Sequence, residues 1–202
     1  MTAAIFIGCA VVSYLFGSIP TGYVWGRARG IDIRQSGSGN IGATNVMRTL
    51  GKGPGVAVLA IDAVKGFLPV FLPPRVFPDL DRNALQILCC LCVIAGHNWT
   101  CWLHFKGGKG IATSGGALLA FLPGPLLCAL GVWLVVFAIG RYVSLASICA
   151  AVALPVAAWL MLKETTLIVF TAIVGGIAIY KHRSNIQRLM AGTENRVGAR
   201  KV

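Results

Sequence analysis

Long, continuous apolar runs set the pattern of this chain of 202 residues. About 20 helical residues cross a hydrocarbon core of ~30 Å, and backbone groups in lipid must bond within a helix. The every-second-residue alternation of a membrane barrel is missing. We therefore expect one all-α domain over residues 1–202, a polytopic integral membrane protein with about seven transmembrane helices. The expected helices cover residues 3–25, 54–72, 84–102, 111–123, 125–140, 143–162 and 166–181.

Two features of this pattern leave the number of spans open. Pro123, Gly124 and Pro125 interrupt the apolar stretch from 111 to 140, so that this stretch forms either two short spans or one interrupted hairpin. A total of five or six spans is then an alternative. The first run lacks a basic segment before it and is long enough to span, so we expect it to be a retained helix rather than a cleaved signal.

The composition and charges agree with a membrane location. The chain is 56% hydrophobic and 12% charged, with a mean hydropathy of +0.78. If the loops alternate between the two sides, 14 of the 18 Lys and Arg residues fall on one side, which the positive-inside rule assigns to the cytoplasm. The amino terminus is then outside and the carboxyl terminus cytoplasmic. This topology and contact with anionic headgroups explain the net charge of +12 without a nucleic-acid partner.

The seven cysteines do not suggest a metal site or a disulfide framework. Six of them lie inside apolar runs, and Cys101 lies at the end of another. The C-x-x-C of Cys89 and Cys92 has no second ligand pair nearby. Because cysteine often packs as a small apolar residue, we expect packing roles.

The first predicted cytoplasmic segment contains small and hydrogen-bonding residues suited to an anion. Glycines let backbone N–H groups converge on a phosphate, hydroxyls and amides add donors, and an arginine adds a fixed charge. A flexible Gly-Ser connector is the alternative interpretation. The match of residues 37–42 to G-x-G-x-x-G is weak evidence, because a membrane helix precedes it in place of a strand. The candidate residues are Gly37, Ser38, Gly39, Asn40, Thr44, Asn45 and Arg48.

The second cytoplasmic segment leads directly into the fourth predicted helix. A helix amino terminus offers unpaired N–H groups and partial positive charge, and two lysines attract a phosphate. A Walker A loop is excluded, because Gly110 follows Lys109 where Ser or Thr is required. A basic membrane anchor with glycines for tight packing is the alternative. The candidates are Lys106, Gly107, Gly108, Lys109 and Gly110.

A third polar cluster comes after the last apolar run. Helical spacing puts His182 and Asn185 on one side. A histidine there can relay a proton or bind phosphate, although a lone surface histidine is usually only solvated. Arg141 and Ser144 form a fourth polar spot on the same predicted side, where a simple positive anchor is the alternative.

Polar residues also occur inside the apolar runs. Asp62 and Lys65, three residues apart, can pair on one helix face. Charge within a membrane span often indicates function, but a purely structural ion pair is equally consistent with the spacing. His97 and Asn98 either line the same site or are satisfied core residues, and the second interpretation is favoured.

Three of these segments together resemble one family, the bacterial membrane acyl-phosphate:glycerol-3-phosphate acyltransferases. The resemblance rests on SGSGNIGATNVMR at 36–48, KGGKGIAT at 106–113 and HRSNIQR at 182–188, and it extends through DAVKG at 62–66 and RYVSLAS at 141–147. It implies transfer of a fatty acyl group from acyl phosphate to glycerol 3-phosphate, giving lysophosphatidic acid. It also implies functional roles for Ser38 and Arg48, for the glycines and lysines of the second segment, and for His182 and Asn185. Glu194 resembles a tail glutamate associated with integrity, and we leave it out of the site.

From these motifs we expect Ser38, Lys109, His182 and Asn185 to be catalytic and the other candidates to bind substrate. Acyl phosphate is an activated anhydride, so orientation and charge stabilisation suffice, and we expect neither a metal nor a cofactor. His182 and a substrate phosphate oxygen are alternative proton acceptors. Membrane lipid and a peripheral enzyme that makes acyl phosphate are the expected partners. A transporter of anionic solutes is the main rival function, and it is disfavoured because the polar motifs gather at one interface.

Overall fold

The structure, a computed structural model, describes residues 1–198, and every regular element in that range is a helix. The expected all-α class is therefore confirmed. The chain forms two compact units, Met1–Phe121 and Leu122–Val202. Two of the basic residues counted on the cytoplasmic side, Arg200 and Lys201, lie outside the described residues. The expectation of a single domain stays a prediction, because two packing units can belong to one domain.

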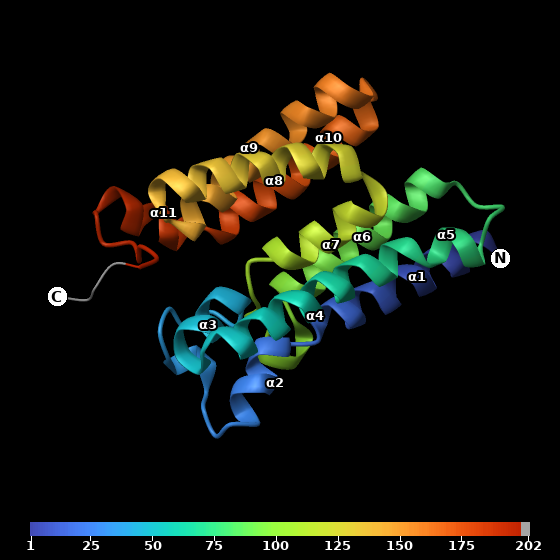
Figure 1. Cartoon of the computed structure of the whole chain (residues 1–202). Helices are drawn as coiled ribbons and strands as arrows, with labels where there is room; N and C mark the ends of the chain where they lie inside the picture. The colour runs from blue at the N-terminus through green and yellow to red at the C-terminus, as the bar shows by residue number, and fades with distance from the viewer. Residues whose placement is uncertain (199–202) are drawn as a thin grey trace. The chain divides into compact units, whose positions relative to one another are not determined.

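Unit 1 is built on four apolar helices that run side by side, α1, α4, α6 and α7 (Figure 1). The amino terminus and α5 lie at one end of this group, and α2 and α3 lie at the other (Figure 1). The elements are α1 (Thr2–Ser18), α2 (Thr21–Arg27), the 3-10 helix η1 (Ile33–Gln35), α3 (Ala43–Leu50), α4 (Lys52–Phe71), α5 (Pro73–Val76), α6 (Arg82–Asn98), the 3-10 helix η2 (Cys101–Leu103) and α7 (Ile111–Phe121).

Unit 2 contains three long apolar helices and one short polar helix. Helix α9 packs against both α8 and α10, and α11 contacts the end of α9 (Figure 1). Proline begins α8 at its first position, where a missing N–H costs nothing. The elements are α8 (Pro123–Gly140), α9 (Val143–Leu162), α10 (Thr165–Lys181) and α11 (Arg183–Met190).

Five helical segments of the described chain are long and apolar enough to cross a membrane. The count rises to six if α10 and α11, bent by 58°, are taken as one broken span. The five segments are Thr2–Arg27, Lys52–Val76, Arg82–Leu103, Pro123–Gly140 and Val143–Leu162.

Six of the seven expected apolar helices are present within a few residues of the expected boundaries, and the first is divided into α1 and α2. The fourth is shorter than expected: α7 has 11 residues, or about 16 Å at 1.5 Å per residue. It is too short to cross a hydrocarbon core of ~30 Å alone. The chain breaks at Leu122, directly before Pro123, Gly124 and Pro125, which were expected to form the break and instead begin α8. Seven complete crossings and the orientation of the two termini stay predictions.

The first apolar run is broken, which the sequence analysis did not anticipate. Pro20 has no N–H and separates α1 from α2, so carbonyl oxygens at the break lose their helical partners. Side chains of neighbouring elements replace them: Thr100 Oγ1 donates to Ser18 O at 2.6 Å, and Lys65 Nζ donates to Ile19 O at 2.7 Å. The break is therefore satisfied from within the protein, as a low-dielectric environment requires.

Glycines let the helices of unit 1 approach closely, as small residues do in membrane bundles. A Cβ at Gly66 of α4 would collide with the carbonyl of Thr113 in α7, and a Cβ at Gly116 of α7 would collide with the carbonyl of Ala63. Gly17 and Gly96 serve the contact between α1 and α6 in the same way. These contacts fix the amino terminus of α7 against the middle of α4.

Candidate functional site

The first polar segment is a loop organised around one buried amide. Asn45, 2% exposed, accepts a hydrogen bond from the Ser38 N–H at 2.7 Å. Its Nδ2 lies 3.1, 2.9 and 2.9 Å from the carbonyl oxygens of Ile33, Ser36 and Asn40. All of its polar atoms are used inside the loop. We therefore revise the role of Asn45 from substrate contact to support of the loop.

The loop presents side chains rather than backbone N–H groups. The N–H of Gly39 bonds to Ser36 O, and the N–H of Gly42 bonds to Asn40 Oδ1, while Ser38 N–H is held by Asn45. The expected nest of converging N–H groups is therefore not formed by these three. Gly37 and Gly39 adopt positive φ of 59° and 69° on either side of Ser38, a conformation that glycine adopts without strain.

The side chains that remain available on this loop suit a phosphorylated substrate. Ser38 is exposed, and Arg48 is exposed on α3. Thr44 lies four residues before Arg48, on the same face of that helix. A hydroxyl and a guanidinium are donors that bind phosphate oxygens.

An exposed ion pair fixes the entry to this loop. Asp32 caps η1 by accepting from Arg34 N, and its carboxylate lies 2.6 Å from Arg34 Nη2. These hydrogen bonds from Arg34 lower the pKa of Asp32 to about 2, so that the carboxylate stays ionised. Arg34 also lies over the Tyr23 ring, 4.7 Å from its centroid.

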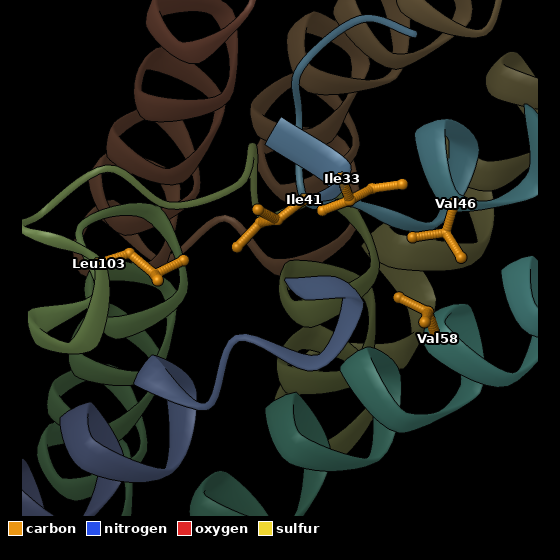
Figure 2. Packing of buried hydrophobic residues seen from close by; sticks show 5 residues of the cluster. All are labelled: Ile33, Ile41, Val46, Val58 and Leu103. Carbon is orange, nitrogen blue, oxygen red and sulfur yellow. The ribbon is translucent and has the colours of Figure 1, made fainter. Parts of the chain in front are cut away.

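A small apolar cluster joins the bases of the first two polar segments. Ile33 and Ile41 of the first loop pack with Val46 of α3, Val58 of α4 and Leu103 of η2 (Figure 2). Leu103 comes three residues before Lys106. Both segments therefore emerge from one end of unit 1, as expected for parts of one site.

The glycines of the second segment are required by its close packing against the end of α6. Gly107 N–H donates to Asn98 O at 3.3 Å and Gly108 N–H donates to His97 O at 3.1 Å. A Cβ at Gly108 would collide with the imidazole of His97, and a Cβ at Gly107 would collide with His97 O. Both N–H groups are therefore used within the protein, and substrate binding by Gly107 and Gly108 stays a prediction.

The last two residues of this segment and the helix that they lead into have the features expected of an anion site. Gly110 has a φ of 78° and turns the chain into α7, which begins at Ile111. The first N–H groups of a helix have no intrahelical partner and carry partial positive charge. Lys109 lies directly before this turn and Lys106 is exposed. The geometry places Lys109 where a helix amino terminus binds anions.

Beneath this segment lies a buried cluster of charge. Lys65 Nζ is 2.8 Å from Asp62 Oδ1, and both side chains are almost fully buried. His97 Nδ1 lies 4.0 Å from the same carboxylate oxygen. Asp62 and Lys65 are therefore paired, as the spacing predicted. The cluster also includes His97, for which a satisfied core position was the favoured interpretation.

The third and fourth polar clusters meet inside unit 2, around a residue that the sequence analysis left out. Glu194 Oε1 accepts from Ser144 Oγ at 2.8 Å and from Asn185 Nδ2 at 2.7 Å, and Glu194 Oε2 accepts from Arg188 Nε at 2.7 Å. Burial alone would raise the pKa of Glu194, but these three hydrogen bonds outweigh it and lower the pKa. Glu194 ties the tail to α9 and α11.

This arrangement bears on the expected roles of Ser144 and Arg141. The hydroxyl of Ser144 is used by Glu194, so we revise Ser144 from substrate contact to support of this cluster. Arg141 ends α8 at a φ of 60° and its carbonyl accepts from Val197 N at 2.9 Å, while its side chain is exposed. Arg141 therefore keeps a guanidinium at the surface of the cluster.

The tautomer of His182 is set by its neighbour. The ring is 3% exposed and Nδ1 lies 2.8 Å from the carbonyl oxygen of Ala178. A carbonyl can only accept, so Nδ1 carries the proton and, in the neutral ring, Nε2 is the accepting nitrogen. Nε2 is therefore the ring nitrogen that is able to accept a proton.

Among the described residues, no group of three or more His, Cys, Asp or Glu side chains is arranged to hold a metal ion. The exposed polar groups of unit 1 include hydrogen-bond donors suited to phosphate oxygens. The polar groups of unit 2 include an oriented imidazole. Together with the five apolar spans, they define a multi-pass membrane protein with polar loops suited to phosphorylated substrates.

The comparisons with known proteins identify the family. A model of the family described as glycerol-3-phosphate acyltransferase matches residues 7–192. The glycerol-3-phosphate acyltransferase of Desulforamulus reducens is 48% identical over 206 residues, covering 100% of this chain and 98% of that protein. Glycerol-3-phosphate acyltransferase 2 of Moorella thermoacetica is 48% identical over 191 residues, covering 94% and 96%. The chain belongs to the glycerol-3-phosphate acyltransferase family of membrane enzymes.

Solved structures agree in fold. The crystal structure of PlsY (YgiH), an integral membrane glycerol 3-phosphate acyltransferase, in its glycerol 3-phosphate form is 38% identical with a TM-score of 0.89 over 96% of both chains. Its lysophosphatidic acid form is 37% identical with a TM-score of 0.86, covering 96% of this chain and 95% of that one. The polytopic membrane fold is therefore confirmed, and acyl transfer replaces transport as the function to be explained.

Proposed function

We propose that this protein transfers a fatty acyl group from acyl phosphate to glycerol 3-phosphate, giving lysophosphatidic acid. The observation that carries the proposal is the family membership combined with phosphate-suited groups where the family motifs lie: exposed Ser38 and Arg48, and Lys109 at the start of α7. The names of the relatives supply the acceptor substrate and the product class. Acyl phosphate as donor is our inference from the sequence motifs.

The reaction needs no further reagent. The glycerol 3-phosphate hydroxyl oxygen attacks the acyl carbonyl carbon, an ester C–O bond forms, and the C–O bond of the anhydride breaks to release inorganic phosphate. The hydroxyl proton passes to His182 Nε2 or to a substrate phosphate oxygen, and these acceptors remain alternatives. Because the anhydride is already activated, positioned charge supplies the catalysis.

Each proposed catalytic residue has a role that its surroundings support. Lys109 and Arg48 bind substrate phosphate, because each carries its charge beside a loop of unit 1. Ser38 donates to a phosphate or to the carbonyl oxygen, and no base is identified beside it to make it a nucleophile. His182 accepts the proton or binds glycerol phosphate. Asn185 lies beside it, because its N–H donates to His182 O while its Nδ2 donates to Glu194.

We further propose that residues 1–202 form one domain with its active site among the polar segments. The basic residues support a position at the cytoplasmic face of the bacterial inner membrane, with the amino terminus outside. Such a site takes an anionic substrate from water and a fatty substrate from lipid. A peripheral enzyme that makes acyl phosphate would then deliver its product at this face.

One assay tests the proposal. Purified protein is mixed with labelled glycerol 3-phosphate and either acyl phosphate or acyl-CoA, and labelled lysophosphatidic acid is measured. We expect product with acyl phosphate alone. Product with acyl-CoA alone would overturn the donor, and no product with either donor from folded protein would overturn the activity.

A further inference from the structure

The buried ion pair of Asp62 and Lys65 has no part in the proposed chemistry. Both residues lie in the middle of α4, 2% and 3% exposed, and neither lies at the loop surface. An ion pair in a low-dielectric interior contributes little net stability, because the desolvation of both charges offsets their attraction. Two apolar residues would fill the same space, so stability alone does not explain the pair.

The pair is connected to its surroundings on both sides. Lys65 Nζ bonds to Asp62 Oδ1 and also to Ile19 O at the break between α1 and α2. On its other side, Asp62 Oδ1 lies 4.0 Å from His97 Nδ1 in α6. The carboxylate therefore lies between a lysine held by the broken helix and the imidazole of His97.

His97 in turn holds the loop that precedes α7. Its carbonyl accepts the N–H of Gly108, and its imidazole lies against the Cα of Gly108 closely enough to exclude any side chain there. The neighbouring carbonyl of Asn98 accepts the N–H of Gly107. A shift of the His97 ring would therefore move Gly108 directly.

The same stretch of α4 also contacts the far side of the loop. Gly66, next to Lys65, packs against the carbonyl of Thr113 in the first turn of α7. Thr113 is fully buried. Residues 62–66 therefore support both ends of the segment that carries Lys109, through His97 before it and through Thr113 after it.

We propose that Asp62, together with Lys65, is a positioning residue for the phosphate-binding segment 106–113. The Asp62 carboxylate lies 4.0 Å from the imidazole of His97 and limits its movement. His97 in turn accepts the N–H of Gly108 and packs against it. These contacts orient Lys109 and the amino terminus of α7 toward the substrate phosphate. The pair itself touches no substrate. The kinetic part of this inference rests on the proposed function, whereas the structural part does not.

The test separates positioning from stability with the double variant Asp62→Asn/Lys65→Met. Removing one partner leaves a buried unpaired charge, whereas removing both often costs little stability. We expect each single variant to melt at a lower temperature in detergent and the double variant to recover most of the loss. Its kcat/KM should stay about ten- to a hundredfold below wild type, mainly through KM for glycerol 3-phosphate, as expected for misplaced binding groups.

Hydrogen exchange of the loop gives a readout that does not depend on activity. In the double variant, the amides of Gly107 and Gly108 should exchange faster than in wild type, because their acceptors on His97 and Asn98 shift. Exchange and kinetics both equal to wild type would overturn the positioning role. If wild type itself lacks activity with acyl phosphate, the proposed function fails and the exchange result still decides this inference.

Two further variants keep the test decisive. Gln86→Leu removes another buried polar side chain of unit 1, whose Nε2 reaches Val70 O and Ala120 O at 3.4 Å, away from the loop. It should lower the melting temperature without changing loop exchange or KM. If the double variant does not fold, Asp62→Glu, which keeps the charge but moves the carboxylate, should raise KM and loop exchange, and wild-type values there would overturn the proposal.

Discussion

Asn45 Oδ1 accepts a hydrogen bond of 2.7 Å from the backbone N–H of Ser38. This bond fixes the position from which the Ser38 side chain meets solvent, while the amide nitrogen of Asn45 holds the carbonyl oxygens around it. The exposed, chemically suited serine thus depends on a buried residue seven positions away.

The first prediction concerns this hydrogen bond. Asn45→Ala should leave several buried groups without partners, at about 1 to 3 kcal/mol each, and should lower kcat at least tenfold because Ser38 loses its support. Melting temperature and steady-state kinetics measure the two effects. Thr49→Val is the matched control, since its hydroxyl only donates to Asn45 O at 2.8 Å. Equal effects of both substitutions would contradict the role of Asn45.

The second prediction concerns pH. The folded state lowers the pKa of Glu194 below its ordinary value of 4.5, so the ionised carboxylate contributes stability that is fully present above that pH. This contribution is lost as pH falls through the lower folded-state pKa. Below about pH 4.5, the melting temperature of wild type should therefore fall more steeply with pH than the melting temperature of Glu194→Gln, which lacks this ionisation.

A control shows whether that difference belongs to the cluster. Glu164→Gln changes an exposed glutamate of the same unit, outside the hydrogen bonds of Ser144, Asn185 and Arg188. Its melting temperature should equal that of wild type at every pH. At pH 7, Glu194→Gln alone should melt lower and turn over more slowly, because Asn185 loses a charged acceptor. Parallel melting curves for Glu194→Gln and wild type across the acid range would refute the linkage.

The third prediction is that Lys109 and Arg48 bind substrate phosphate. A hydrogen bond to a charged group contributes about 1.5 to 3 kcal/mol net, so each Ala variant should raise the KM for glycerol 3-phosphate or acyl phosphate about ten- to a hundredfold. Lys52→Ala, at an exposed lysine where α4 begins, is the control and should leave both KM values unchanged. Unchanged kinetics in both folded test variants would remove them from the site.

The fourth prediction is topological. The polar segments should all be labelled from the cytoplasmic side when cysteine is placed at Ser36, Lys106 and Met190 and a membrane-impermeant reagent is applied. Lys106 is preferred to Gly107, where a side chain would strike His97 O. Labelling of the wild-type protein is the control for reaction at the native cysteines, of which Cys128 is exposed. Labelling of any two positions from opposite sides would end the single-site hypothesis.

The sequence predicted the helices well because lipid leaves the backbone few alternatives: continuous apolar runs must be helical. It predicted the chemical character of each polar segment, because the residue types Gly, Ser, Lys and Arg alone determine which chemical groups the segment contains. It did not predict the break at Pro20, because the partners that satisfy it, Lys65 and Thr100, are 46 and 82 residues away from the carbonyls they bind.

The roles within the site were less predictable for the same reason. Whether a polar side chain faces substrate or supports its neighbours depends on contacts between distant segments. Asn45 and Ser144 have the residue types of ligands, yet their hydrogen bonds are used internally. Glu194 was left out of the site because the sequence around it matches the family pattern only loosely, although its carboxylate joins the tail to α9 and α11.

The last prediction concerns the division of roles between His182 and Ser38. If positioned charge drives the reaction, the substrate hydroxyl attacks the acyl carbonyl directly and neither residue becomes acylated. His182 Nδ1 is held by Ala178 O, so Nε2 is the nitrogen that can take a proton or bind glycerol phosphate. His182→Ala and Ser38→Ala should each lower kcat about 10² to 10⁴-fold, the range for loss of a proton acceptor or a key donor.

The deciding measurement is mass spectrometry of wild-type enzyme mixed with acyl phosphate alone. Direct transfer predicts no acyl adduct on either residue at times comparable with one turnover. Thr49→Val serves as the kinetic control, because its hydroxyl bonds only to Asn45 O within the same helix. An adduct on Ser38 that forms and decays as fast as the overall reaction would overturn direct transfer and make Ser38 the nucleophile.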